Sequence, residues 1–86
     1  MKLTDSSTKA DLLNRVRRLE GQVRGVARMI EEDRDCNEIL QQLAAVRSAA
    51  HQAAVALVRA YASECVANGS SAEVAEALAK ALARLA

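Results

Sequence analysis

Two cysteines are the residues of this 86-residue chain best suited to chemistry. A deprotonated thiol is a nucleophile and a ligand for soft metal ions. Cys36 and Cys65 are 29 positions apart, about eight turns of an α-helix, so both thiols would face nearly the same direction on a single helix. Along a straight helix, however, they would lie about 43 Å apart, and no disulfide or shared ligand could join them within one chain.

An antiparallel second copy of the same helix removes this difficulty. If the two-fold axis passes near residues 50 and 51, Cys36 of one chain lies beside Cys65 of the other, and this pairing occurs twice per dimer. Cys36 is predicted to begin its helix, where free backbone N–H groups favour a thiolate, although neighbouring carboxylates oppose it. Cys36 is therefore the expected nucleophile. The alternative is that both cysteines are small apolar residues at helix ends without a chemical role.

Two further side chains are candidates for a role near the thiols. Tyr61 lies one helical turn before Cys65 and would face the same site, where its phenol either hydrogen-bonds a thiolate or simply packs. His51 is more than about 20 Å from either cysteine on the same helix and falls at the expected two-fold axis. A structural or solvated His51 is the simpler interpretation, and a pH-sensitive or DNA-proximal role is the alternative.

The apolar pattern predicts three helices and no β-strands. Apolar residues recur every three or four positions at about residues 8–31, 36–66 and 71–85, as expected of amphipathic helices. Asp35, with Glu38 three places later, predicts a capping box for the second helix. At 1.5 Å per residue that helix would be about 45 Å long, roughly twice what the third helix can cover, so its remaining surface requires a second chain.

The composition favours one small all-α domain that forms an oligomer. Hydrophobic residues make up 51% of the chain, but only 1% is aromatic and there is no proline, which favours helix over sheet. A chain this small with so few large side chains would be hard to stabilise alone. One distant histidine and no glycine-rich phosphate loop argue against an enzyme.

The charges are unevenly distributed along the chain. The net charge is +1, yet residues 1–30 carry seven Lys and Arg against three Asp and Glu, which predicts one basic surface on a nearly neutral molecule. No apolar run suggests a membrane span or a signal peptide, so we expect a cytoplasmic protein without a membrane partner. In a reducing compartment, two cysteines are expected to be reactive thiols, ligands or core residues rather than a structural disulfide.

Several stretches of the chain resemble the CsoR/RcnR family of bacterial repressors, which are small helical sensors of metals and thiol-reactive species. The likeness covers nearly the full length and rests on residues 14–25 (NRVRRLEGQVRG), 29–33 (MIEED), Cys36, 42–47 (QLAAVR) and 64–65 (EC). The resemblance implies a dimer of dimers, a homotetramer whose long antiparallel helices carry sensor sites between subunits. It also implies operator DNA as the partner, released when the signal is sensed.

One position departs from the copper-sensing members of this family. Those sensors bind Cu(I) with two cysteines and a histidine one turn before the second cysteine, and the three positions here are Cys36, Tyr61 and Cys65. A neutral phenol is a poor ligand for Cu(I). The chain is therefore most similar to the CstR branch of persulfide sensors, and we expect a repressor without a cofactor. The alternative is a Cu(I) sensor that uses the two thiolates as its metal ligands.

Persulfide sensing would use the two thiols in sequence. Cys36 attacks the outer sulfur of a persulfide or polysulfide molecule, and Cys65 of the neighbouring chain resolves the product into a bridge between subunits. Two other hypotheses remain: a sensor of general oxidants or electrophiles, and a structural or copper-carrying helical bundle that never touches DNA.

The residues expected to contact DNA are basic or polar and come mainly from the first helix: Arg15, Arg17, Arg18, Gln22, Arg24 and Arg47. The family resemblance favours Arg15 and Arg18 and adds Arg47 from the second helix. Because no base-reading element is visible, shape and phosphate contacts should contribute heavily to binding. The resemblance also suggests Glu76 as an acidic neighbour of the sensor site.

Overall fold

The computed structural model contains three α-helices, and it describes residues 2–68 and 71–85, with the backbone alone for Cys65, Val66, Asn68, Ser71 and Val74. In chain order the helices are α1 (Ser6–Glu31), α2 (Cys36–Asn68) and α3 (Ser71–Leu85). The described ranges contain no strand, so the all-α prediction is confirmed. α1 begins two residues earlier and α2 ends two residues later than the apolar pattern predicts. No helix in these ranges is long and apolar enough to cross a lipid bilayer.

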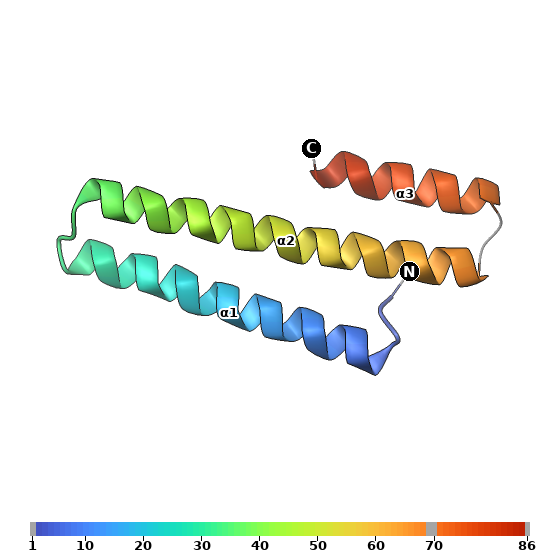
Figure 1. Cartoon of the computed structure of the whole chain (residues 1–86), viewed down its shortest axis with the longest axis horizontal. Coiled ribbons are helices and arrows are strands. Elements are labelled where there is room, and N and C mark those ends of the chain that lie inside the picture. Colours follow the sequence, from blue (N-terminus) through green and yellow to red (C-terminus); the bar gives the residue numbers. More distant parts are fainter. Residues whose placement is uncertain (1, 69–70, 86) are drawn as a thin grey trace.

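The three helices form a single flat layer. α2 is central, with α1 and α3 packed on opposite sides of it, and the described parts of α1 and α3 do not contact one another (Figure 1). The layer measures 54 × 27 × 12 Å, so its thickness is one helix diameter. Its radius of gyration is 16.6 Å, against about 12 Å for a compact domain of this length. Val26 of α1 is the one buried hydrophobic residue among those described, so most apolar side chains remain in contact with solvent.

Asp5 caps the N-terminus of α1. Its carboxylate accepts hydrogen bonds from the Thr8 hydroxyl at 2.6 Å and from the Thr8 backbone N–H at 2.9 Å. Both bonds stabilise the charged carboxylate and so lower the pKa of Asp5, and the bond from the Thr8 hydroxyl has the larger effect. Just before the cap, the Thr4 hydroxyl donates to Glu64 of α2 at 3.4 Å. The N-terminal segment therefore lies against the C-terminal part of α2.

A short turn between α1 and α2 reverses the chain. The backbone N–H of Asp33 bonds to the carbonyl of Ile30 at 3.2 Å, and the N–H of Arg34 bonds to the carbonyl of Met29 at 3.0 Å. This is the hydrogen-bond pattern of a Schellman motif. Asp33 holds the left-handed position with a φ of 56°, where glycine is the usual residue because it has no Cβ.

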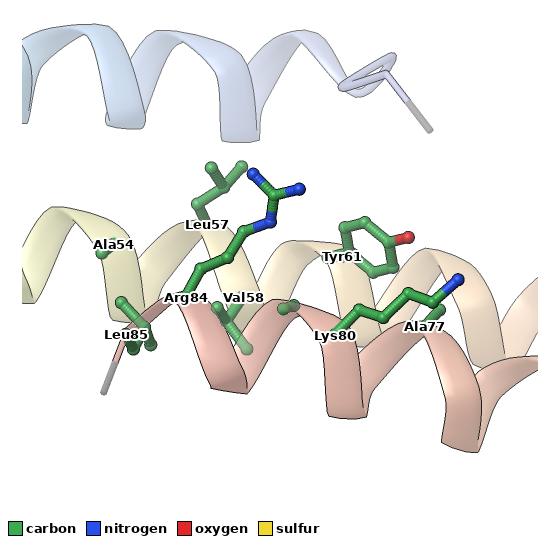
Figure 2. Close-up of a pocket in the computed structure, with 9 residues that line it drawn as sticks. Ala54, Leu57, Val58, Tyr61, Ala77, Lys80, Arg84 and Leu85 are labelled. Carbon is green, nitrogen blue, oxygen red and sulfur yellow. The ribbon is translucent and has the colours of Figure 1, made fainter.

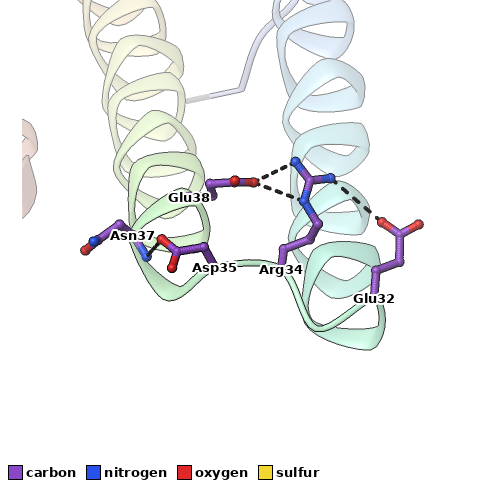
Figure 3. A network of polar contacts seen from close by, with 5 residues as sticks. All are labelled: Glu32, Arg34, Asp35, Asn37 and Glu38. Atoms are coloured by element: carbon purple, nitrogen blue, oxygen red, sulfur yellow. Dashed lines mark hydrogen bonds and ion pairs between the residues drawn. The ribbon is translucent and has the colours of Figure 1, made fainter.

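The polar contacts of this turn centre on Arg34 (Figure 3). Its guanidinium donates to Glu38 at 2.6 and 3.0 Å and lies 3.9 Å from a carboxylate oxygen of Glu32. Asp35 accepts the backbone N–H of Asn37 at 3.0 Å, which confirms its predicted role as a cap of α2. The predicted capping box does not form, because Arg34 holds the Glu38 carboxylate that would complete it.

Candidate functional site

Cys36 is the first residue of α2, and it is exposed. It directly follows the Asp35 cap, at the end of the layer where α1 turns into α2. The nearby ion pair between Arg34 and Glu38 lies on another side of the helix, because Cys36 and Glu38 are two positions and about 160° apart. The thiol is therefore accessible to a metal ion, an electrophile or a second chain.

Cys65 lies near the other end of α2, and its side chain is outside the described residues. Figure 1 shows the two ends of α2, green at the start and orange at the finish, at opposite ends of one uninterrupted helix. The 29 positions between the cysteines correspond to about 43 Å along it. The two thiols therefore cannot meet within one chain.

Tyr61 is half-buried and lines a groove of about 540 Å³ between α2 and α3. In Figure 2, Arg84 extends from α3 to beside Leu57 of α2, and Lys80 extends along α3 below Tyr61. Glu76 is exposed, and Lys80 lies 3.4 Å from its carboxylate. Tyr61 thus lines a groove against α3, and Glu76 forms an ion pair with Lys80 of its own helix.

Within the described part of the chain, no three His, Cys, Asp or Glu side chains come together closely enough to hold a metal ion. His51 is exposed in the middle of α2, 14 positions before Cys65 and 15 after Cys36. It is therefore too far along the helix to bind the same metal ion as either thiol of its own chain. A metal site with three or more such donors would therefore need at least one donor from outside the described side chains of a single chain.

One broad side of the α1–α2 pair is apolar and exposed. Val23 is 50% exposed and Leu43 is 46% exposed, although both are large hydrophobic side chains on long helices. The apolar face, as we define it, comprises Val16, Val23, Ile30, Leu43 and Leu57. Its three members on α1 recur every seven residues, which keeps them on one side of that helix. Large apolar side chains exposed together on one side of a protein are typical of a protein interaction site.

The opposite side of the same helix pair is cationic. Two cavities of about 150 and 220 Å³ lie between α1 and α2 and share two lining residues. The cationic face, as we define it, comprises the polar side chains that line them: Arg15, Arg18, Gln22, Gln52 and Arg59. Val16 and Arg18 are two positions apart on α1, as are Leu57 and Arg59 on α2, so each pair is separated by about 160° around its helix. Both helices therefore turn apolar side chains to one side and arginines to the other.

The other arginines predicted to contact DNA lie elsewhere. Arg17 and Arg24 are exposed on the outer edge of α1, about 160° or more around the helix from the buried Val26. Arg47 is exposed on α2, but it is about 140° around that helix from Gln52. The structure therefore gathers only part of the predicted set into one surface: Arg15, Arg18 and Gln22.

The sequence pattern does not predict Gln52 or Arg59 as part of this surface. One signal in the sequence could have identified Arg59: Leu57 is followed two positions later by an arginine, just as Val16 is followed by Arg18. That spacing becomes informative only when the register between α1 and α2 is known, because the register decides which α2 positions lie beside Arg15.

Comparison with known proteins shows a consistent set of relatives. Residues 8–85 match a family model described as a metal-sensitive transcriptional repressor. The chain is 45% identical over 84 residues to the copper-sensing transcriptional repressor RicR of Mycobacterium tuberculosis (strain ATCC 25618 / H37Rv), covering 90% of this chain and 86% of that protein. It is 44% identical over 63 residues to the copper-sensing transcriptional repressor CsoR of Bacillus subtilis (strain 168), covering 73% of this chain and 62% of that protein, which is under two thirds of its length.

These relatives correct one expectation. The prediction that the sensor has no cofactor is wrong, because the relatives at 44–45% identity are copper-sensing repressors. The phenol of Tyr61 in place of an imidazole is not sufficient reason to exclude a metal, since two thiolates still provide the soft donors that Cu(I) prefers. The narrower assignment to the persulfide-sensing CstR branch gains no support from these relatives and stays a prediction.

The fold comparison agrees with the sequence comparisons. The nickel-responsive transcriptional regulator InrS superposes with a TM-score of 0.82 at 33% identity, covering 100% of this chain and 98% of that one. These proteins regulate transcription and are not enzymes, in agreement with the expectation from the sequence. The chain belongs to the CsoR family of metal-sensitive transcriptional repressors.

Proposed function

We propose that this protein is a Cu(I)-responsive repressor that binds operator DNA without the metal and releases it when Cu(I) binds to Cys36 and Cys65. The observation that carries this proposal is an exposed thiol at the first residue of α2 in a chain 45% identical to a copper-sensing repressor. Thiolate sulfur is a donor that Cu(I) prefers over harder ligands.

The sensor site would form between two antiparallel protomers. Pairing two copies through the apolar face would bury side chains that one layer leaves exposed. Cys36 and Cys65 are equally distant from a midpoint between residues 50 and 51. Ala50 is exposed and lies seven positions from both Leu43 and Leu57, on the same side of α2, and its small side chain would allow two helices to approach closely there. Each dimer would then hold two equivalent thiol pairs, and two such dimers would form the proposed homotetramer.

The donor set of this site suits Cu(I). Bound Cu(I) would link one protomer to the next through the two thiolates, since neither chain has both of them at one end. Tyr61 provides only a neutral phenol and lines the groove beside α3. We therefore assign Tyr61 and Glu76 to positioning α3 near the sensor site rather than to metal binding.

The cationic face is the proposed DNA-contact surface. Arg15 and Arg18 supply guanidinium groups that suit phosphate oxygens, and Gln22 lines the same cavity. Because this face is opposite the apolar face, DNA and the dimer partner would approach the layer from opposite sides. Arg17, Arg24 and Arg47 lie outside this surface, and Arg24 lines a cavity with Val16 and Val23 of the apolar face. Their contacts with DNA stay predictions from the sequence.

Titration with Cu(I) against a chelator of known affinity tests the proposal. Cu(I) should bind the protein tightly and release a fluorescent duplex made from the DNA upstream of its own gene. Cys36→Ser and Cys65→Ser should each lower the Cu(I) affinity by more than the roughly 10–100-fold typical of changes outside the ligand set. His51→Gln is the control and should keep the parent affinity. Negligible Cu(I) affinity, or Cu(I) binding that leaves the DNA complex intact, would contradict the proposal.

A persulfide-responsive repressor is the second candidate function, favoured by the phenol at Tyr61. The Cys36 thiolate would take the outer sulfur of a persulfide and release its thiolate. The Cys65 thiolate of the neighbour would then attack the inner sulfur, forming a disulfide and expelling hydrosulfide. The two thiols are oxidised and the persulfide is reduced. Intact-mass spectrometry after treatment with glutathione persulfide should show two joined chains, and unlinked chains alone would remove this candidate.

A further inference from the structure

The two cavities between α1 and α2 adjoin one another, because two residues line both of them. The smaller cavity is lined by Arg15 and Arg18 of α1 and the larger by Arg59 of α2, and Arg15 and Gln52 line both. Three arginines from two helices therefore border these two adjoining cavities. Like charges gathered in this way repel one another, so the arrangement favours binding of an anion.

Most of this positive charge is not neutralised within the chain. In the described part of the protein, neither Arg18 nor Arg59 forms an ion pair, and Arg15 is paired only with Asp11, at 3.3 Å. The Asp11 carboxylate is 63% exposed and the Arg15 side chain is 39% exposed, so this pair is weak and open to competition from another anion.

We propose that Arg59, together with Gln52, is a DNA-contact residue that completes a phosphate-binding site with Arg15 and Arg18. This inference rests on the proposed repressor function and assigns part of the DNA surface to the helix that carries the thiols. Guanidinium groups bind phosphate oxygens through paired hydrogen bonds, and the Gln52 amide adds a further donor. The ligand is the phosphodiester backbone of duplex DNA.

This assignment provides a physical route from the sensor to the DNA. Arg59 is six residues before Cys65 on the same helix, about 9 Å along its axis. Arg15 and Arg18 belong to α1, which carries no thiol. Any displacement of the end of α2 on Cu(I) binding therefore changes the spacing between Arg59 and the α1 arginines, and with it the match to successive phosphates.

Fluorescence anisotropy with the upstream duplex, repeated over a series of salt concentrations, tests the inference. Arg59→Ala should lower the DNA affinity by about tenfold or more, which corresponds to loss of a charge-assisted hydrogen bond. It should also reduce the slope of log affinity against log salt by about 0.9 for each protomer that contacts DNA. Arg59→Lys should retain most of the salt slope. Helix content by circular dichroism and Cu(I) affinity should match the parent protein in both variants.

Arg84→Ala is the matched control, because Arg84 is an exposed arginine of α3 that does not line either cavity. Its affinity and salt slope should equal those of the parent. If Arg59→Ala keeps the parent affinity and slope while Arg15→Ala loses them, the inference is wrong and the repressor function stands. If the parent itself shows no salt-dependent binding to the upstream duplex, the proposed repressor function fails as well.

Discussion

The two broad sides of the α1–α2 pair differ in chemistry although they are built from the same two helices. The apolar face exposes Val23 and Leu43 to solvent, and the cationic face gathers Arg15, Arg18 and Arg59 around a polar recess. One side can gain free energy only by excluding water against another apolar surface. The other can do so by binding an anion. A layer one helix thick, with an extent of 12 Å in this direction, thus carries two surfaces suited to different kinds of binding partner.

This separation explains how one small domain can be both a sensor and a DNA-binding protein. The apolar face would place Cys36 beside the Cys65 of a second chain, and the opposite face would contact DNA. α2 contributes to both sides, with Leu43 and Leu57 on one and Gln52 and Arg59 on the other. A change in how two α2 helices pack would therefore alter both faces together.

The largest expected effect comes from placing a charge on the apolar face. Val23→Glu would bury a carboxylate without a partner in the dimer, at a cost of about 3–5 kcal/mol per site. We expect dissociation to monomers, partial loss of helix, and loss of Cu(I) affinity. Sedimentation velocity and circular dichroism measure these changes. Ala10→Glu, on the exposed outer edge of α1, should remain assembled, and an intact Val23→Glu dimer would show that dimers form through another surface.

Gln22 tests whether the cationic face is built for binding rather than stability. Its Oε1 atom is buried and has no hydrogen-bond partner within the described part of the chain, and such an atom costs about 1–3 kcal/mol. Gln22→Met should therefore raise the free energy of unfolding by about 1 kcal/mol and weaken DNA binding. Gln52→Met, at an exposed position, should give no such gain in urea unfolding. A less stable Gln22→Met protein would indicate that the amide has a partner.

The turn at Asp33 affects both the apolar and the cationic face, because it fixes how α1 packs on α2 and so decides which residues lie on each face. Asp33→Gly removes the strain of a Cβ at a φ of 56° and should stabilise the protein by about 0.5–1 kcal/mol. Asp33→Asn should be nearly neutral, and Asp33→Val should destabilise. Thermal unfolding would order the three variants, and a destabilised Asp33→Gly protein would contradict the role given to the backbone here.

Asp11 provides a smaller test of the cationic face. Its carboxylate lies 3.3 Å from Nε of Arg15 and competes there with a phosphate. Asp11→Asn should tighten DNA binding by about two- to fivefold, with a stability change below about 0.5 kcal/mol because the pair is exposed. Glu20→Gln, which removes the same charge beside the apolar face, should have less effect on anisotropy titrations. Equal effects from both would indicate that net charge alone matters.

The smallest effect concerns acid stability at the start of α1. The pKa of Asp5 is lowered by hydrogen bonds from Thr8, so its contribution to stability is present above the usual pKa of 3.8 and is lost as the pH falls through the lower folded-state value. Asp5→Asn should lose less thermal stability than the parent between neutral pH and that acidic range. Parallel melting curves for the two proteins at every pH would contradict this role.

The sequence predicts the elements of this fold well, for local reasons. Apolar spacing and the Asp35 cap define α2, and the 29-residue separation of Cys36 and Cys65 follows from helix geometry alone. The ends of helices are less accurate: α1 begins at Ser6, directly after the Asp5 cap, two residues before the predicted start. The predicted capping box at Glu38 is wrong because Arg34, three positions beyond the end of α1, binds the same carboxylate.

Only part of the candidate site could be predicted from the sequence. The type and spacing of the thiols could be predicted, and so could the row formed by Arg15, Arg18 and Gln22, because these features depend only on position within one helix. Reading Tyr61 as evidence against a metal failed, because the absence of one ligand does not remove the affinity of the remaining thiolates for Cu(I). The grouping of Arg59 with Arg15 depends on packing between helices, which no single-helix pattern contains.

By itself the sequence determined three amphipathic helices, two thiols too distant to meet in one chain, and a basic first helix. The first two follow from the regular repeat and rise of an α-helix, and the third follows from the count of charged residues. Only the tertiary structure decided that the helices lie in one layer, that Arg59 joins Arg15 across α1 and α2, and that the apolar side chains remain uncovered. The physical reason is that the side-to-side register of two helices is set by the turn that joins them and by the side chains packed between them, and these contacts connect residues far apart in the chain.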